Sequence, residues 1–241
     1  MRALILCAGE GRRLRPLTQI VPKPLIPVAG VPMVVRQILA LRAAGIQEFV
    51  LNVAHGARIL MAQLGDGAKW GVRITWSVEG FTAADGLETR GGIVKALPLL
   101  AGEQAEPFIA VAGDIVTDFD YRALVEKAQS FSAEGILGHL VLVPNPDFHA
   151  CGDFALEKGK ILRPDGAHPT YTFSSLALYH PALFAGVAPG FAKLFPWMLG
   201  AIDAGRITGS LYEGLWANVG TPLELDRAEA LLRQHVAREA R

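Results

Sequence analysis

The chain has 241 residues, 51% of them hydrophobic and 19% charged, so it is long enough to bury a full core. Its 23 basic and 23 acidic residues cancel, which argues against a general affinity for nucleic acid and predicts that any anion site is local. Two cysteines are too few for a disulfide framework, and no signal-peptide pattern precedes the first predicted strand. We therefore expect one domain, residues 1–241, in the cytoplasm, with small substrates.

The first half of the chain, residues 1–120, alternates strand and helix patterns. Continuously apolar runs predict buried strands, and apolar residues at helical spacing predict helices, one of them stopped by Gly45. The expected strands are 3–6, 49–53, 72–77 and 108–112, and the expected helices lie within 31–45, 57–64 and 92–100. This alternation predicts an α/β fold with a Rossmann-like, doubly wound, mostly parallel sheet.

The second half, residues 121–241, has strand patterns with few helices between them. The expected strands are 136–143, 154–157 and 171–179, and a last amphipathic helix covers 223–236. We expect this half to be partly antiparallel, with a hairpin turn at Gly159. Residues 166–192 carry no charged side chain over a length that could span a bilayer, but three prolines interrupt them, so we expect a strand, a turn and a short helix and no membrane contact.

Residues 3–24, A-L-I-L-C-A-G-E-G-R-R-L-R-P-L-T-Q-I-V-P-K-P, join a strand pattern to a glycine turn, three arginines and a lysine between prolines. Gly9 and Gly11 allow the backbone to approach a ligand, and the cations suit phosphate. The dinucleotide fingerprint does not fit, because its third glycine is Leu14, and the G-K-[ST] of a P-loop is absent. The remaining alternative is a tight turn with solvated arginines.

Ligands of doubly wound sheets bind beyond the carboxyl ends of the strands. Three segments should meet there, namely the glycine loop, the turn after Ser77 and the pair Gly113-Asp114. Asp114 follows an apolar strand pattern, so its carboxylate could hold Mg²⁺, an ion that uses one or two protein oxygens together with phosphate and water. The competing interpretation of Asp114 is a turn or helix cap.

These residues resemble the sugar-phosphate nucleotidyltransferase family, whose opening signature is approximately L-A-G-G-x-G-T-R-L-x-P-L-T followed by P-K-P. The resemblance is strongest to the short bacterial uridylyltransferases acting on N-acetylmuramic acid 1-phosphate. Further similar segments span nearly the whole chain: L-E-T-R-G-G-I-V-K-A-L-P-L-L (87–100), G-D-I-V-T-D (113–118), G-D-F-A-L (152–156), T-F-S-S-L-A-L-Y-H-P-A-L-F (172–184) and W-A-N-V-G-T (216–221).

The resemblance implies a GT-A-like fold and an enzyme that makes a nucleotide-sugar and pyrophosphate from UTP and a sugar 1-phosphate, in peptidoglycan recycling. It implies Mg²⁺ as cofactor, bound by Asp114 and by Asn218, which stands where relatives usually have the acidic residue of W-x-D-V-G-T. Arg13 and Lys23 match the catalytic cations. The amide in place of a carboxylate predicts weaker metal binding.

The resemblance also assigns the substrate-binding residues. The nucleotide-binding residues are Ala8, Gly9, Gly11, Glu79, Thr89 and Gly91, and the sugar-binding residues are Gly152, Asp153 and Ser174. The E-K-P motif that supplies a sugar-phosphate lysine in larger relatives is missing, since Lys158 stands in E-K-G-K. Lys193 is another possible phosphate partner, with a solvated lysine at a helix start as the alternative.

Two other functions stay open. One is a mannose or glucose 1-phosphate nucleotidyltransferase that uses another base. The other is a catalytically silent nucleotide-sugar sensor, suggested by Asn218 and by Arg90, which stands where relatives carry a small residue. The partners are in each case small molecules, and the oligomeric state is left open.

Overall fold

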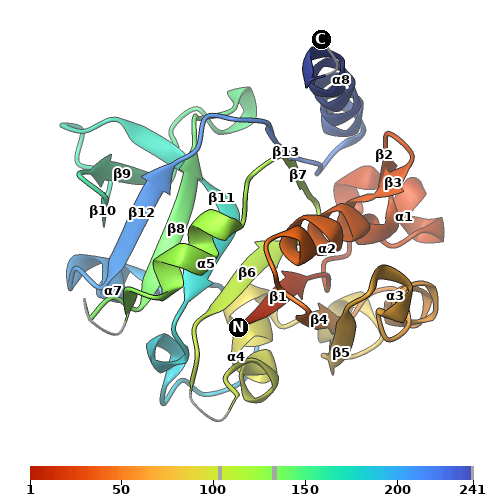
Figure 1. Cartoon of the computed structure of the whole chain (residues 1–241), viewed down its shortest axis with the longest axis horizontal. Coiled ribbons are helices and arrows are strands. Elements are labelled where there is room, and N and C mark those ends of the chain that lie inside the picture. Colours follow the sequence, from red (N-terminus) through yellow and green to blue (C-terminus); the bar gives the residue numbers. More distant parts are fainter. Residues whose placement is uncertain (103–104, 132–134, 240–241) are drawn as a thin grey trace.

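A computed structural model describes residues 1–102, 105–131 and 135–239 (Figure 1). Its centre is a nine-stranded mixed sheet with the order β5-β4-β1-β6-β11-β8-β12-β10-β9. Strands from both halves of the chain therefore share one sheet. Their bounds are β1 Arg2–Leu6, β4 Glu48–Val53, β5 Arg73–Val78, β6 Phe108–Ala112, β8 Gly138–Val143, β9 Phe154–Glu157, β10 Lys160–Leu162, β11 Thr170–Tyr179 and β12 Ile207–Leu211.

The strands of the first half are parallel and covered on both faces. Ala3 of β1 pairs with Phe49 of β4 and Ile109 of β6, all in parallel register. Ala3 and its neighbours on that face pack against helices α2 (Met33–Ala43) and α3 (Ala57–Leu64), whereas Leu4 packs against α4 (Glu88–Leu100) on the other face. Successive strand residues thus serve two cores, which confirms the doubly wound parallel sheet.

The second half continues the sheet mostly in antiparallel fashion. Strand β11 runs antiparallel to β6, with Leu178 opposite Ile109, and antiparallel to β8 on its other side. Strands β9 and β10 form a hairpin whose turn residues Lys158 and Gly159 have φ of 48° and 81°. The expected mixed character of the sheet and the hairpin turn are both confirmed.

Several elements escaped the sequence patterns. Strand β12 contains Gly209, which reads as a strand breaker; a Cβ there would lie 2.3 Å from Ile161 Cδ1, so the glycine permits close packing of β12 on β10. Helix α4 begins at Glu88, four residues earlier than expected. Other unexpected elements are short: β2 Pro27–Val28, β3 Val31–Pro32, β7 Ile115–Thr117, α5 Arg122–Ala128, α7 Leu199–Asp203 and β13 Trp216–Asn218.

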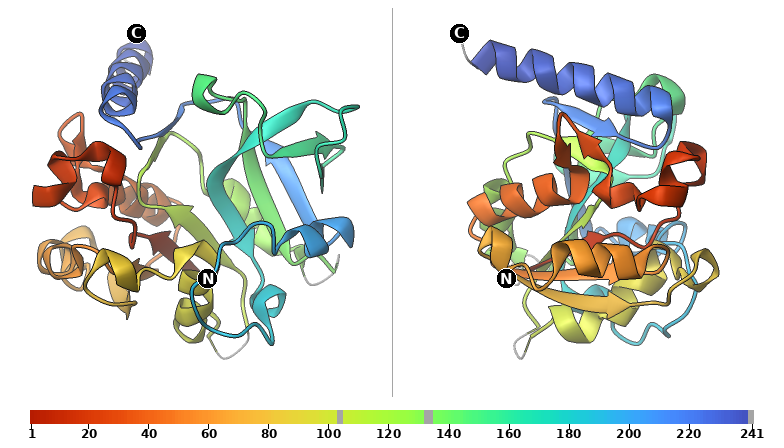
Figure 2. Two further views of the ribbon diagram at one scale, coloured as in Figure 1. Left: turned by 180° about the vertical axis from the view of Figure 1, so that it is seen from behind. Right: turned by 90° about the vertical axis from the view of Figure 1, so that its right-hand side faces the viewer.

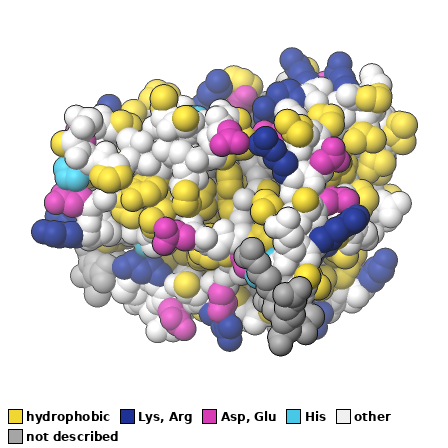
Figure 3. All heavy atoms as spheres, turned by 90° about the horizontal axis from the view of Figure 1, so that it is seen from above, with side chains coloured by type: hydrophobic (Ala, Val, Ile, Leu, Met, Phe, Trp, Pro, Cys, Tyr) yellow, Lys and Arg dark blue, Asp and Glu magenta, His cyan; other side chains and the backbone are white. Residues whose placement is uncertain are grey.

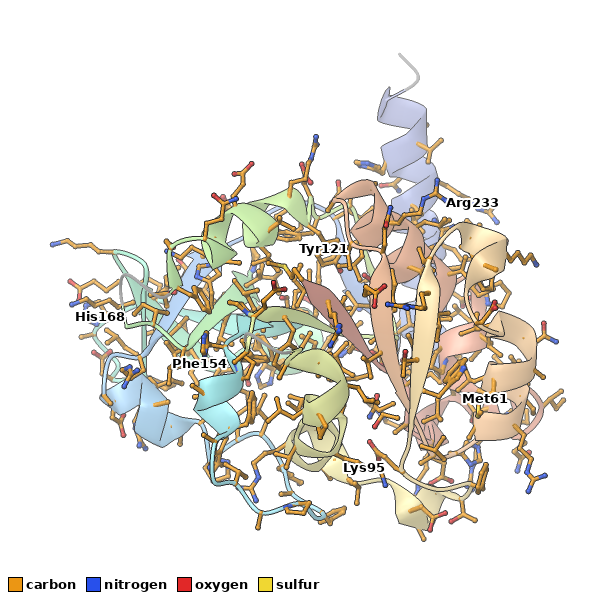
Figure 4. All side chains as sticks on the ribbon, turned by 60° about the horizontal axis from the view of Figure 1, so that its bottom comes forward. Met61, Lys95, Tyr121, Phe154, His168 and Arg233 are labelled. Carbon is orange, nitrogen blue, oxygen red and sulfur yellow. The ribbon has the colours of Figure 1, made fainter. Side chains whose placement is uncertain are left out.

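A third, smaller core packs the segment that follows β1 against the C-terminal part of the chain. Helix α8 (Pro222–Glu239) crosses one end of the molecule (Figure 2) and packs through Ala228 near Val219, Leu14 and Val116. Strand β13 pairs with β7 beside it. Gln37 lies on the same face of α2 as Met33, one turn later, and it accepts a hydrogen bond from the buried hydroxyl of Tyr121, which Figure 4 labels.

The surface carries charges of both signs side by side, without a large field of one sign on the face that Figure 3 shows. Among the helices of the described residues, none is both long and apolar enough to span a membrane.

Candidate active site

A cleft of about 940 Å³ opens where β1 and β6 end, and it continues over β11. Six of the predicted site residues line it: Ala8, Gly9, Gly11, Lys23, Thr89 and Asp114. The sequence therefore predicted correctly that the glycine loop and the β6 end meet; the turn after Ser77, expected with them, does not line the cleft, and the start of α4 does. The residues predicted for the site that do not line the cleft are Arg13, Glu79, Gly91, Gly152, Asp153, Ser174 and Asn218.

The glycine loop presents free backbone donors. Within the part of the chain that the structure describes, the N–H groups of residues 8–11 donate no hydrogen bond. Gly11 has φ of 68°, and a Cβ on it would lie 2.9 Å from Thr18 Cγ2 and 3.1 Å from Lys23 Cβ. Glycine at this position thus lets the loop close onto the lysine. Unpaired N–H groups gathered at a strand end suit a phosphate.

Lys23 points into the cleft and pairs with Asp114. Lys23 stands between two prolines and is the first residue of a short 3-10 helix, Lys23–Leu25. Its ammonium forms an ion pair with the carboxylate of Asp114. The two side chains are only 12% and 23% exposed. Asp114 is brought there by Gly113, whose N–H donates to the Leu6 carbonyl at 2.9 Å and where a Cβ would lie 2.9 Å from Cys7 Sγ.

Asn218 adjoins Asp114 through the β7–β13 ladder. It pairs with Ile115, and the N–H of Val219 donates to the Asp114 carbonyl at 3.1 Å. Its side-chain oxygen Oδ1 is buried and has no hydrogen-bond partner, a condition that costs free energy unless something binds there. A carboxylate next to an orphaned amide oxygen is a donor set that fits Mg²⁺.

Arg13 lies outside the cleft lining. Its side chain is exposed. It lies against Gly220 in the loop after β13: a Cβ added to this glycine would be 2.6 Å from Arg13 Nη2 and 3.0 Å from Glu224 Oε2. The neighbouring Arg12 and Arg15 both form ion pairs with Glu10, whose pKa they lower. Arg12 and Arg15 are therefore held by a carboxylate instead of being freely solvated.

Glu79 lies outside the cleft lining and hydrogen-bonds a residue that lines it. Its Oε1 accepts from Asn52 Nδ2 at 2.6 Å and its Oε2 accepts from the Leu87 N–H at 2.7 Å. Asn52 in turn accepts from the Cys7 N–H at 2.9 Å and lines the cleft. Both carboxylate oxygens of Glu79 therefore already accept hydrogen bonds from this chain. Glu79 orients Asn52, a cleft residue that the sequence analysis did not identify.

Gly91 contacts a loop from the second half. Its N–H donates to the Ala192 carbonyl at 3.1 Å, and a Cβ on it would lie 2.2 Å from the Gly190 carbonyl oxygen. Gly91 therefore does not face the cleft; it lets residues 190–192 close against α4, while Thr89 two residues earlier remains in the lining.

The predicted sugar-side residues support the cleft wall. Asp153 Oδ2 accepts from the N–H of Phe173, a cleft residue, at 2.8 Å, and its Oδ1 lies 3.0 Å from His149 Nε2. Gly152 has φ of 63° and packs against Asn145, where a Cβ would come within 2.6 Å of Oδ1.

Ser174, which the sequence assigned to the sugar, does not face the cleft. Its side chain is fully buried, and its hydroxyl donates to the Val141 carbonyl at 2.6 Å. A register shift between Phe173 and Leu176 follows, and Ser175, with φ of 63°, lines the cleft instead. A β-bulge of this kind redirects side chains and leaves no clear trace in the sequence.

Taken together, a doubly wound sheet, a glycine loop with free N–H groups and a lysine–aspartate pair at the strand ends define a nucleotide-binding α/β protein of the phosphate-transferring class. The chain belongs to the nucleotidyl transferase family, whose model matches residues 2–160. It is 43% identical over 233 residues to N-acetylmuramate alpha-1-phosphate uridylyltransferase of Neisseria meningitidis serogroup B, covering 96% of this chain and 98% of that protein.

A further curated protein is similar in sequence, and two solved structures share the fold. Mannose-1-phosphate guanyltransferase beta-B of Xenopus laevis is 29% identical over 92% of this chain, which spans 62% of that protein's length. A putative glucose-1-phosphate thymidylyltransferase from Bacillus anthracis superposes with a TM-score of 0.80 at 22% identity, over 97% of this chain and 96% of that one. HddC from Yersinia pseudotuberculosis, complexed with GMP-PN, gives 0.74 at 18% identity, over 96% and 99%. The expected GT-A-like fold is confirmed.

Proposed function

We propose that this protein transfers a nucleotidyl group from a nucleoside triphosphate to a sugar 1-phosphate and releases pyrophosphate. The observation that carries the proposal is the Lys23–Asp114 pair, placed beside a glycine loop with free N–H groups in a chain of the nucleotidyl transferase family. The site offers cations and amide donors to a polyphosphate and needs no protein nucleophile.

In the proposed reaction an oxygen of the sugar's phosphate attacks the α-phosphorus of the triphosphate. A new P–O bond forms as the bond to the β-phosphate oxygen breaks, and pyrophosphate leaves with the electron pair. The N–H groups of Ala8, Gly9 and Gly11 hold the phosphates, and Lys23 offsets the negative charge that grows on them. Catalysis then consists of alignment and charge stabilisation. Arg13 would join them by turning away from Glu224, to which its guanidinium is now adjacent.

Asp114 and Asn218 are the residues that would hold Mg²⁺, since they supply one carboxylate and one unpaired amide oxygen. The ion, when bound, neutralises phosphate charge. Lys23 donates to the same carboxylate, so it fixes the orientation of Asp114 for that task.

For the substrates we propose UTP and N-acetylmuramic acid 1-phosphate, which places the reaction in peptidoglycan recycling. The support is the 43% identity to a protein that carries this activity in its name. The base would lie near Thr89. Glu79 and Gly91 would support its pocket through their hydrogen bonds to Asn52, Leu87 and Ala192. The sugar would lie along Phe173 and Ser175, which Gly152 and Asp153 support. We treat residues 1–241 as one domain, with a nucleotide half and a sugar half, since one sheet runs through both.

The test is a pyrophosphate-release assay over the four ribonucleoside triphosphates and dTTP, each with N-acetylmuramic acid, N-acetylglucosamine, glucose and mannose 1-phosphates. We expect turnover with Mg²⁺ to be fastest for UTP with the muramic acid substrate. Preference for GTP with mannose 1-phosphate would instead favour the activity named for the Xenopus relative. Binding of UDP-sugar without turnover of any pair would favour a silent sensor and overturn the proposal.

A further inference from the structure

Lys193 differs from the other cations of the cleft in its lack of a partner. Among the described residues, three basic side chains line the cleft, and two of them form ion pairs, Arg12 with Glu10 and Lys23 with Asp114. Lys193 has no ion pair or hydrogen bond with any residue in the described ranges. Its charge is therefore available to a ligand without first breaking a contact within the chain.

The backbone before Lys193 is fixed to the nucleotide half. Ala192 forms two backbone hydrogen bonds with the start of α4: it accepts from the Gly91 N–H at 3.1 Å and donates to the Leu87 carbonyl at 2.9 Å. Gly91 permits the approach, since any side chain there would collide with the Gly190 carbonyl. The residue before Lys193 is therefore held against the start of α4 by two backbone hydrogen bonds.

The backbone after Lys193 is fixed to the sugar half. Leu194 is buried, and the ring of Phe195 packs 5.0 Å from Phe154 and 5.9 Å from Phe173, measured between centroids. The Arg90 guanidinium of α4 lies 5.5 Å from the centroid of the Trp197 ring, so the segment after Lys193 also contacts the nucleotide half, and Arg90 itself lies outside the cleft lining. Lys193 therefore lies in a segment that contacts both halves, and it lines the same cleft as Phe173.

We propose that Lys193 binds the phosphate of the sugar 1-phosphate, the acceptor of the proposed reaction, on which this inference rests. Two anions must approach each other in this cleft, and the glycine loop and Lys23 serve one of them. Lys193, which lines the cleft together with Thr89 of α4 and Phe173, offsets the charge of the second, so that its oxygen can approach the α-phosphorus. It exchanges no proton; the bond changes remain those of the acceptor oxygen and the leaving pyrophosphate.

Lys158 provides a matched control, because it is the lysine of E-K-G-K, the segment that the sequence predicted as a hairpin and not as a phosphate site. The structure places it in the exposed turn of the β9–β10 hairpin, outside the cleft lining. Lys158→Ala should leave both Michaelis constants within about twofold of wild type, because a solvated side chain contributes little.

The experiment measures initial rates for wild type, Lys193→Ala, Lys193→Arg and Lys158→Ala with the best substrate pair. For Lys193→Ala we expect the KM of the sugar 1-phosphate to rise about 10- to 100-fold, as for loss of a charged hydrogen bond, and the KM of the triphosphate to change little. Lys193→Arg should recover much of the loss. In the reverse direction, the KM of the nucleotide-sugar should rise and that of pyrophosphate should not.

An unchanged KM for the sugar 1-phosphate in Lys193→Ala, or equal increases for both substrates, would overturn the inference. A melting temperature equal to wild type separates these outcomes from misfolding. If wild type releases no pyrophosphate with any pair, the proposed function itself falls, a result distinct from the failure of Lys193 alone. A loss in Lys158→Ala with a normal Lys193→Ala would assign the acceptor phosphate to the hairpin.

Discussion

Lys23 and Asp114 are 91 residues apart in the chain and form an ion pair in which both side chains are mostly buried. Neither residue type is common in such surroundings without a partner. The pair joins the P-K-P segment to the end of β6. Each member thereby holds the other at the point where the glycine loop offers its free N–H groups.

Lys23→Ala should lower kcat by about 10²-fold, the usual cost of removing one donor that stabilises charge in the transition state. Steady-state rates with saturating substrates provide the measurement. Lys69→Ala is the control, because Lys69 lies over the Trp70 ring far from the cleft lining. A kcat equal to wild type in Lys23→Ala would remove this lysine from the mechanism.

Asp114→Asn should keep the fold and lower Mg²⁺-dependent turnover by at least about 10²-fold, since the carboxylate charge of a metal site contributes several kcal/mol. The matched variant is Asp120→Asn, which changes an exposed aspartate paired with Arg122. Thermal melting checks the fold, and a Mg²⁺ titration checks the site. Normal turnover by Asp114→Asn would contradict the assignment of the metal ligand.

Asn218→Asp should reduce the Mg²⁺ concentration needed for half-maximal rate by about tenfold, because a second negative oxygen strengthens binding of a hard cation. Asn218→Ala should shift the requirement the other way. Both curves are measured at a fixed concentration of triphosphate. If neither substitution moves the curve, Oδ1 of Asn218 lies outside the coordination sphere, and its burial without a partner needs another explanation.

Gly91→Ala should lower the free energy of unfolding by about 1–3 kcal/mol, because the added methyl must displace the Gly190 carbonyl, 2.2 Å away. It should also raise the KM of the sugar 1-phosphate, since Lys193 would lose its anchor. Gly200→Ala in α7 has open space and should instead add about 0.4–1 kcal/mol. Urea denaturation compares the two; equal stabilities would show that the loop does not rest on Gly91.

His139 should make the fold sensitive to acid. Burial between Thr208 and Ser210 lowers its pKa from 6.5 to about 4, with a smaller contribution from the charge of Lys127. The unfolded chain therefore binds the proton first as the pH falls. The contribution of the neutral His139 ring to the free energy of unfolding is therefore fully present above about pH 6.5. It falls by up to roughly 3 kcal/mol as the pH decreases toward 4. His139→Gln should flatten this part of the stability curve; parallel curves for the two proteins would contradict it.

The elements that the sequence predicted well are those whose signal is local. Strands of the first half read as unbroken apolar runs, and α2 ends just before Gly45, as expected, so residues a few positions apart determined these elements. Strand β12 was missed because Gly209 is explained only by Ile161 on the neighbouring strand. The bulge that buries Ser174 depends in the same way on pairing with β8.

By itself, the sequence determined the chemistry at the strand ends: a glycine loop, a lysine held between prolines and an aspartate after an apolar strand, since short runs of residues specify their own backbone and charge. Only the tertiary structure decided which side chains face the ligand space. It placed both oxygens of Glu79 behind the cleft, set Arg13 beside Glu224 and brought Lys193 in on a loop held by α4. These outcomes depend on partners far away in the chain, whose contacts exist only once the sheet has been assembled.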